Sequence, residues 1–209
     1  MKTKKRDLLN RYIPLWSIAP LVTIMAENCL IYWGSSALTA GRYHFDFTMA
    51  FDREVPLLPV FVWFYILAFP FWAVGYLLAT RRGKDMFYRF VATDLTIHFI
   101  CFICFILIPT TNIRPEIAGN TLSEKILALV YSLDGGNSPS NLFPSIHCYV
   151  SWMCWKGVEG SEKVPKWYQR FSLVFAILII ISTQVLKQHY IVDAAAALLL
   201  VEFFWRFYQ

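Results

Sequence analysis

Long apolar runs are the feature that most limits what this chain can fold into. A helix needs roughly 20 apolar residues to cross the hydrocarbon core of a bilayer. Six runs approach this length, and they cover residues 13–38, 57–79, 87–108, 142–155, 171–186 and 190–208. With 57% hydrophobic residues, the chain is also more apolar than a soluble domain. The sequence therefore predicts an all-α membrane protein, a bundle of six transmembrane helices.

The basic residues indicate how these helices are oriented. They form three clusters. One precedes the first run, the next lies between the second and third runs, and the last lies between the fourth and fifth: Lys2, Lys4, Lys5, Arg6 and Arg11; Arg81, Arg82, Lys84 and Arg89; Lys156, Lys163, Lys166 and Arg170. Six crossings put all three clusters on one side of the membrane, which the positive-inside rule makes cytoplasmic. Both termini are then cytoplasmic. The same alternation makes membrane topology a better explanation of the net charge of +5 than nucleic-acid binding.

Nothing in the sequence divides the chain, so residues 1–209 are expected to form one domain. The basic amino terminus resembles a signal peptide, but the apolar run after it is long and lacks a clear cleavage site, which favours a retained first span. All five cysteines lie in apolar stretches and are expected to be buried free thiols. Residues 116–140 read as a loop that could act as a lid. Compact size and few loops favour a bacterial plasma membrane.

His189 and Asp193 stand four residues apart at the predicted outer start of the sixth span. This spacing puts both side chains on one face of a helix, within reach of each other. A carboxylate beside an imidazole fixes its tautomer, and such a histidine can act as a base or nucleophile. A pair that only packs helices together is an equally good explanation of this motif alone, although ionisable groups inside a membrane are more often functional.

The segment Asn141–Trp152 has a second histidine, His147, near the outer end of the fourth span. Pro144 suits the first turn of a helix, and the free N–H groups of that turn attract anions. Ser145 can add a hydroxyl donor. A capped helix whose histidine faces lipid headgroups would have the same sequence, but a second histidine on the outer face favours a site.

Two cations complete the group of candidate site residues on the predicted outer face. Arg114 follows the third span, and a guanidinium is the preferred planar partner of a phosphate. Lys187 lies two residues before His189. Taken alone, Arg114 reads as an interfacial residue on lipid headgroups. No carboxylate cluster resembles a metal cage, and Asp46, Asp52 and Glu54 stand alone in a loop, so we expect metal-independent catalysis without a cofactor.

Further polar groups lie inside the spans. Asp94 and His98 are four residues apart in the third span, and Glu27 and Asn28 lie within the first. Either pair could form a second site or a proton path. Hydrogen bonding between helices is the preferred interpretation.

The outer-face residues resemble the type 2 phosphatidic acid phosphatase superfamily of membrane lipid phosphatases and phosphotransferases. Its three signatures are KxxxxxxRP, PSGH and SRxxxxxHxxxD. This sequence has the corresponding residues in the same order: Arg114-Pro115; Pro144-Ser145-Ile146-His147; Ser182, His189 and Asp193. The order, spacing and six-span plan are similar from about the second span onward.

The resemblance implies a role for each matching residue. His189 would be the nucleophile that forms a phosphohistidine, and Asp193 would orient it. His147 would protonate the leaving alkoxide and then activate the incoming water or alcohol. Arg114 and Ser145 would hold the phosphate oxygens.

Three positions depart from the signatures. Leu107 stands at the lysine, Thr183 at the arginine of the third signature and Ile146 at the glycine. Two phosphate-binding cations are thus replaced, and Lys187 is the available substitute. With these departures, the signatures of this sequence are more similar to those of the branch that contains inositol phosphorylceramide synthases and sphingomyelin synthases.

The sequence thus predicts a metal-independent phosphatase acting at the outer membrane face on a lipid phosphate monoester or diphosphate. Phosphatidic acid, phosphatidylglycerophosphate and polyprenyl phosphates are candidate substrates, and membrane lipids are the only other expected partners. One alternative is a phosphotransferase that passes the headgroup to an alcohol. Another is a lipid-binding or transport protein without catalysis.

Overall fold

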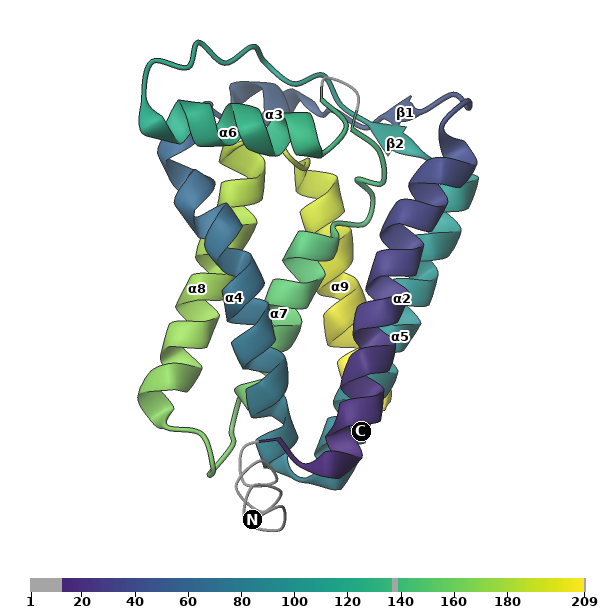
Figure 1. Ribbon diagram of the computed structural model, residues 1–209, viewed down its shortest axis with the longest axis vertical. Helices are drawn as coiled ribbons and strands as arrows, with labels where there is room; N and C mark the ends of the chain where they lie inside the picture. Colours follow the sequence, from purple (N-terminus) through teal and green to yellow (C-terminus); the bar gives the residue numbers. More distant parts are fainter. Residues whose placement is uncertain (1–12, 137–138, 209) are drawn as a thin grey trace, which may run out of the picture.

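Helices account for most of the regular structure in the computed structural model, which describes residues 13–136 and 139–208 (Figure 1). The basic cluster from Lys2 to Arg11 lies outside the described residues. The longer helices are α2 (Leu15–Thr39), α4 (Val62–Ala79), α5 (Lys84–Leu107), α8 (Lys166–Val185) and α9 (Ile191–Phe207). The shorter ones are α3 (Ala50–Glu54), α6 (Leu122–Leu133) and α7 (Ile146–Val158), with 3-10 turns at Pro59–Phe61 and Thr80–Arg82.

Four helical segments of the described chain are long and apolar enough to cross a membrane: Leu15–Thr39, Pro59–Arg82, Lys84–Leu107 and Lys166–Val185. They correspond to the first, second, third and fifth predicted spans. Helices α7 and α9 have 13 and 17 residues and are shorter. At 1.5 Å per residue, α7 reaches only about 20 Å, less than the roughly 30 Å of a hydrocarbon core. The count of six spans and the orientation of the termini stay predictions.

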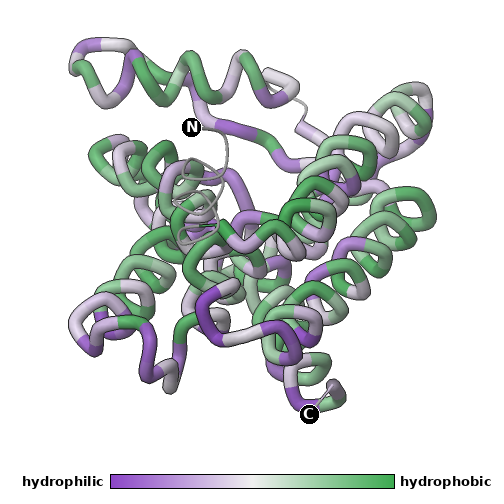
Figure 2. The backbone as a smooth tube through the Cα atoms, turned by 60° about the horizontal axis from the view of Figure 1, so that its bottom comes forward, coloured by the Kyte–Doolittle hydropathy of each residue, from purple (hydrophilic) through white to green (hydrophobic). Residues whose placement is uncertain are grey.

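Helix α7 is the centre of the bundle. It packs against α4, α5, α8 and α9, and its residues Cys148, Tyr149 and Met153 are fully buried. The approach of α4 is close, because a Cβ added to Gly75 would lie 2.6 Å from the sulfur of Cys154. The tube in Figure 2 is mainly hydrophobic along the long helices, and hydrophilic residues gather in the segments that join them. Close van der Waals packing around α7, with a small residue at the contact with α4, therefore holds the bundle together.

One end of the bundle is covered by short elements. Strand β1 (Phe45–Asp46) pairs in parallel with β2 (Thr110–Thr111), with Phe45 opposite Thr110 and Asp46 opposite Thr111. Helices α3 and α6 lie across the same end (Figure 1). This arrangement ties the connection after α2 to the connection after α5.

The interpretation of residues 116–140 as a loop is wrong for Leu122–Leu133, which form α6. The helix begins with a capping box, in which the Thr121 hydroxyl accepts from the Glu124 N–H and the Glu124 carboxylate accepts from the Thr121 N–H. Leu127 and Tyr131 are buried against α4 and the turn before it. The Thr-x-x-Glu pattern before an apolar stretch is a recognised helix start, and it could have been read from the sequence.

Candidate active site

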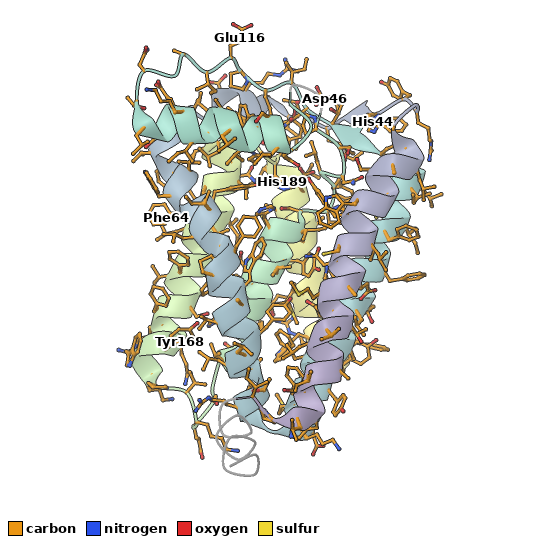
Figure 3. The ribbon with its side chains drawn as sticks, viewed as in Figure 1. His44, Asp46, Phe64, Glu116, Tyr168 and His189 are labelled. Carbon is orange, nitrogen blue, oxygen red and sulfur yellow. The ribbon has the colours of Figure 1, made fainter. Side chains whose placement is uncertain are left out.

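The turn between α8 and α9 sets the position of His189. The backbone N–H groups of Gln188 and His189 both donate to the carbonyl of Thr183, at 2.9 and 3.1 Å. Lys187 adopts a φ of +53°, a left-handed conformation that reverses the chain in few residues. Figure 3 shows His189 close below α6, at the end of the bundle that also holds Asp46 and Glu116.

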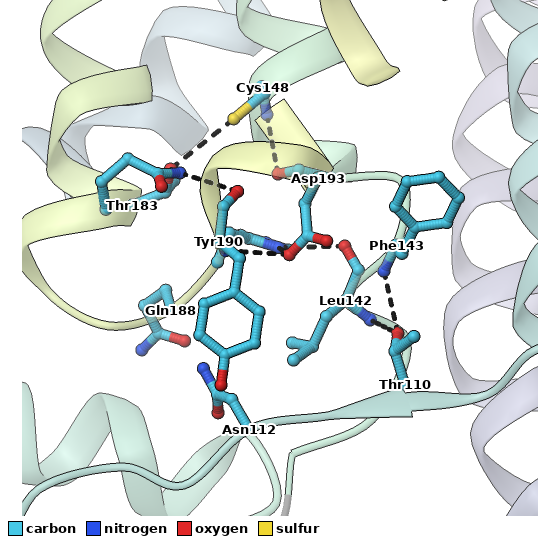
Figure 4. Close-up of polar contacts among 12 residues, drawn as sticks. Thr110, Asn112, Leu142, Phe143, Cys148, Thr183, Gln188, Tyr190 and Asp193 are labelled. Atoms are coloured by element: carbon cyan, nitrogen blue, oxygen red, sulfur yellow. Dashed lines mark hydrogen bonds and ion pairs between the residues drawn. The ribbon is translucent and has the colours of Figure 1, made fainter. Parts of the chain in front are cut away.

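The predicted His189–Asp193 pair is formed. The Nδ1 atom of His189 lies 3.4 Å from a carboxylate oxygen of Asp193 and 3.0 Å from the carbonyl oxygen of Leu142 (Figure 4). Both neighbours are hydrogen-bond acceptors, so Nδ1 carries the proton and Nε2 keeps its lone pair. The same Asp193 oxygen accepts from the Tyr190 N–H at 2.9 Å, which fixes the carboxylate at the start of α9. His189 is thus oriented with Nε2 as its nucleophilic atom.

His147 stands beside His189, with 5.9 Å between the ring centroids. Its ring stacks on Tyr65 at 4.5 Å and meets the edge of Trp72 at 5.0 Å. The Nε2 atom of His147 is buried and has no hydrogen-bond partner among the described residues. A buried imidazole nitrogen without a partner is costly unless a ligand uses it.

Ser145 connects α7, which carries His147, to α9, which carries Asp193. Its hydroxyl oxygen accepts from the Cys148 N–H at 3.2 Å and caps α7, while its own N–H donates to the carbonyl of Asp193 at 3.2 Å. On the other side, the Thr110 hydroxyl in β2 accepts from the N–H groups of Leu142 and Phe143 (Figure 4). The strand therefore fixes the segment whose carbonyl oxygen faces His189.

Arg114 is buried and most of its donors are already used. Its Nη1 donates to the carbonyls of Asp134 and Gly136, at 2.8 and 3.1 Å, and more weakly to that of Tyr131. Its Nη2 bonds the Asp134 carboxylate and the side-chain oxygen of Gln188. The guanidinium thus caps the C-terminal end of α6, and only its Nε has no partner among the described residues. Its predicted contact with a phosphate stays a prediction.

Removing the Arg114 side chain is expected to destabilise the protein. Arg114→Ala leaves the Asp134 carboxylate without its cationic partner and the carbonyls at the end of α6 without their donor, and breaking a largely buried pair in this way costs about 3 kcal/mol. We expect a lower midpoint of thermal unfolding in detergent. Arg53→Ala, at an exposed position in α3, is the matched control and leaves the midpoint unchanged. An unchanged midpoint for Arg114→Ala would contradict this role.

The structure places the Lys187 ammonium against the α3 segment. Its Nζ donates to the carbonyl oxygens of Asp52, at 2.6 Å, and Val55. Burial lowers the pKa of Lys187, and the nearby Asp52 carboxylate opposes that shift. The ammonium therefore holds α3 on the turn before His189, and its contact with a substrate phosphate stays a prediction.

Sequence reasoning missed several residues that support the site. The Asp52 carboxylate, read as isolated, accepts from the Ile191 N–H at 2.8 Å and so caps the start of α9. Gln188 and Asp134 pair with Arg114, and Tyr65 stacks on His147. The contacts of Asp52 with Ile191 and of Asp134 with Arg114 and Tyr32 join positions that lie 139, 20 and 102 residues apart, so no local pattern marks them.

An apolar cavity of about 700 Å³ adjoins His147. It lies between α2, α4, α6 and α7. Its walls include Tyr65, Phe69, Trp72 and Leu129. Among the described residues, no group of three His, Cys, Asp or Glu side chains is placed to hold a metal ion.

The Asp94–His98 pair forms a separate cluster. Asp94 bonds His98 at 3.1 Å and also accepts from the Tyr76 hydroxyl, while the other ring nitrogen of His98 bonds Tyr149. These contacts join α4, α5 and α7, which confirms the expected hydrogen bonding between helices. Glu27 has a buried carboxylate oxygen without a partner among the described residues.

Fold and site together define an integral membrane protein of apolar helices with two neighbouring histidines, one of which, His189, is oriented by an aspartate. The family model described as the PAP2 superfamily matches residues 41–205, most of the chain. The chain therefore belongs to the PAP2 superfamily, and its function is of the phosphatase or phosphotransferase type. Neither a curated protein nor a solved structure matches the chain. The match begins after α2, in agreement with the extent of the sequence resemblance.

Proposed function

We propose that the protein is a metal-independent lipid phosphatase that acts at the outer face of the membrane through a phosphohistidine. The observation that supports it most is the pairing of His189, held by Asp193 with Nε2 free, with the unpartnered Nε2 of His147. One histidine is thus prepared as a nucleophile and the other as a proton carrier.

Each step uses one of these nitrogens. Nε2 of His189 attacks the phosphorus and forms an N–P bond, while the bond from phosphorus to the lipid oxygen breaks. The leaving alkoxide takes a proton from His147. Neutral His147 then removes a proton from water, which attacks the phosphohistidine, releases phosphate and restores His189.

The outer location rests on charge. His189 lies at the α6 end of the bundle, whereas Tyr168 lies near the opposite end (Figure 3). The basic clusters at Arg81–Arg89 and Lys156–Arg170 belong to the opposite end. The positive-inside rule assigns that end to the cytoplasm and the His189 end to the outside.

Phosphate release by the purified protein in detergent tests the proposal. The panel contains phosphatidic acid, phosphatidylglycerophosphate and a polyprenyl phosphate, with His189→Ala as control. Release from one lipid that is absent in the variant supports the phosphatase. Absence of release from every lipid contradicts it and favours the transferase below.

Chelation is expected to leave the activity intact. The proposed steps use only His189, His147 and Asp193, and none requires a Lewis acid. The initial rate of phosphate release is measured with and without an excess of EDTA. Loss of activity that a divalent ion restores would contradict the metal-free mechanism.

A phosphotransferase is the second candidate, and the shortage of free cations favours it. Leu107 and Thr183 replace two family cations, and the Arg114 guanidinium is paired with Asp134. A monoester carries a charge of about −2 near neutral pH, whereas a diester carries one charge, which needs less compensation. Supplying inositol, glycerol or ceramide to the enzyme with a phosphodiester lipid should then yield a new phosphodiester. A phosphatase yields only inorganic phosphate.

A further inference from the structure

Two arginines lie against one indole ring at the end of the bundle opposite His189. The guanidinium carbon of Arg89 stands 4.7 Å from the centroid of the Trp205 ring, and that of Arg82 stands 6.0 Å from it. Arg82 ends the 3-10 turn after α4, Arg89 lies near the start of α5, and Trp205 lies near the end of α9. Segments far apart in the sequence thus bring two positive charges to one place.

Each guanidinium is held by the last turn of a helix. Nη1 of Arg82 donates to the carbonyl oxygen of Lys156 at 3.0 Å, close to the end of α7. Nη2 of Arg89 donates to the carbonyl oxygen of Trp205, close to the end of α9. Cations are favourable at the C-terminal end of a helix, so these contacts give both arginines a structural role. In the described part of the chain they use one nitrogen of each guanidinium, which has five N–H donors.

The charges of the two arginines lack a close carboxylate partner. Glu159 and Glu202 at the same end both pair with Lys156, at 3.3 and 2.9 Å. Arg82 interacts with Glu159 only over a longer distance, and it also interacts with Arg89 as a like charge. Within residues 13–136 and 139–208, neither arginine forms an ion pair. An anion from outside the chain would compensate both charges.

One donor of this pair is buried and unused. The Nε atom of Arg89 has no hydrogen-bond partner among the described residues. A buried N–H without an acceptor is costly, and a ligand oxygen that accepts from it removes that cost. Phosphate oxygens suit this place, because a guanidinium donates to two of them through adjacent N–H groups.

The place of the pair in the bundle indicates a lipid as the source of the phosphate. The arginines stand near the adjoining ends of two candidate spans, Pro59–Arg82 and Lys84–Leu107. The connection between these spans lies at one end of the bundle (Figure 1). Headgroups occupy that level of a membrane, and tryptophan is enriched there. Tyr88 and Phe207 expose their rings on the same helices and offer apolar surface to acyl chains.

We propose that Arg82, Arg89 and the Trp205 ring bind the phosphate headgroup of an anionic phospholipid at the end of the bundle opposite the histidines. The phosphate oxygens accept from Nε of Arg89 and from the free N–H groups of Arg82, and the acyl chains stay in the bilayer. This lipid is not the substrate, and its binding does not depend on the proposed function. Phosphatidylglycerol fits the site better than phosphatidylcholine, whose ammonium group cancels the phosphate charge.

Native mass spectrometry of the purified protein in detergent tests the site. Wild-type protein is expected to keep phosphatidylglycerol in preference to phosphatidylcholine. Arg82→Gln/Arg89→Gln is expected to weaken binding of phosphatidylglycerol about tenfold or more. Lys163→Gln/Lys166→Gln is the matched control, because it removes the same charge from exposed positions at the same end and leaves the preference unchanged. Equal weakening in both variants would show attraction by net charge alone and overturn the proposal.

A second variant and a second anion complete the test. Both substitutions to glutamine remove helix caps, so Arg89→Lys is measured as well, because it keeps the positive charge and lacks the Nε–H. It is expected to lose part of the preference for phosphatidylglycerol. A preference that stays at the wild-type value in Arg89→Lys and in the double arginine variant would contradict the assignment. Displacement of the lipid by an equal concentration of inorganic phosphate would assign the site to a soluble anion instead.

Discussion

His189→Gln is expected to abolish phosphate release, with a loss of about 10⁴-fold or more in kcat, as when other nucleophiles are removed. The reason is geometric. Asp193 and the Leu142 carbonyl hold the Nδ1 proton, which leaves Nε2 as the attacking atom. Glutamine keeps a polar side chain of similar length but has no nucleophilic nitrogen, because its amide lone pair is delocalised.

A trapped intermediate makes this prediction specific. Wild-type protein mixed briefly with ³²P-labelled lipid phosphate and quenched in alkali is expected to keep label on a peptide that contains His189. His189→Gln keeps none. His44→Gln is the matched control, because His44 lies outside the site and bonds only the Arg42 carbonyl in the described structure. Label on a different residue, or full activity of His189→Gln, would exclude His189 as the nucleophile.

The helices that sequence alone could predict are those whose apolar runs are long enough to cross a membrane. The run at 87–108 agrees with α5, and the run at 171–186 agrees with most of α8. The run at 142–155 is displaced, because α7 begins at Ile146 and continues to Val158. Its last turn contains Lys156, which hydropathy places outside a span. The structure instead pairs this lysine with Glu159 and Glu202, and these carboxylates compensate its charge.

The two histidines and Asp193 could be found because local spacing and the family signatures both mark them. The residues that hold these three side chains in place could not be found from the sequence. Tyr32 contacts Asp134 across 102 positions, and Asp52 contacts Ile191 across 139. A single polar residue has no periodicity that reveals a distant partner, so these contacts depend on the folded bundle. The signatures also hide the state of Arg114, since they mark the residue but not the α6 carbonyls that occupy its donors.

Replacing His147 is expected to slow the enzyme in a way that depends on the leaving group. His147→Gln removes the proton donor, and a positioned general acid contributes about 10²- to 10⁴-fold. A lipid alkoxide is a poor leaving group and needs that proton. Nitrophenolate is a weaker base and leaves without taking a proton. The first step with p-nitrophenyl phosphate is therefore expected to stay within about tenfold of wild type, while release from the lipid phosphate falls by the full factor.

Hydrolysis of the phosphohistidine, the second step, gives another test of proton transfer by His147. His147 also activates water, so the variant is expected to release a burst of nitrophenol close to one per protein, followed by slow turnover. Stopped-flow absorbance measures the burst, and the ³²P label on His189 should persist longer than in wild type. Tyr65→Phe keeps the ring that stacks on His147 and serves as a control for packing. Equal losses for both substrates without a burst would show that His147 supports the structure of the site and does not transfer the proton.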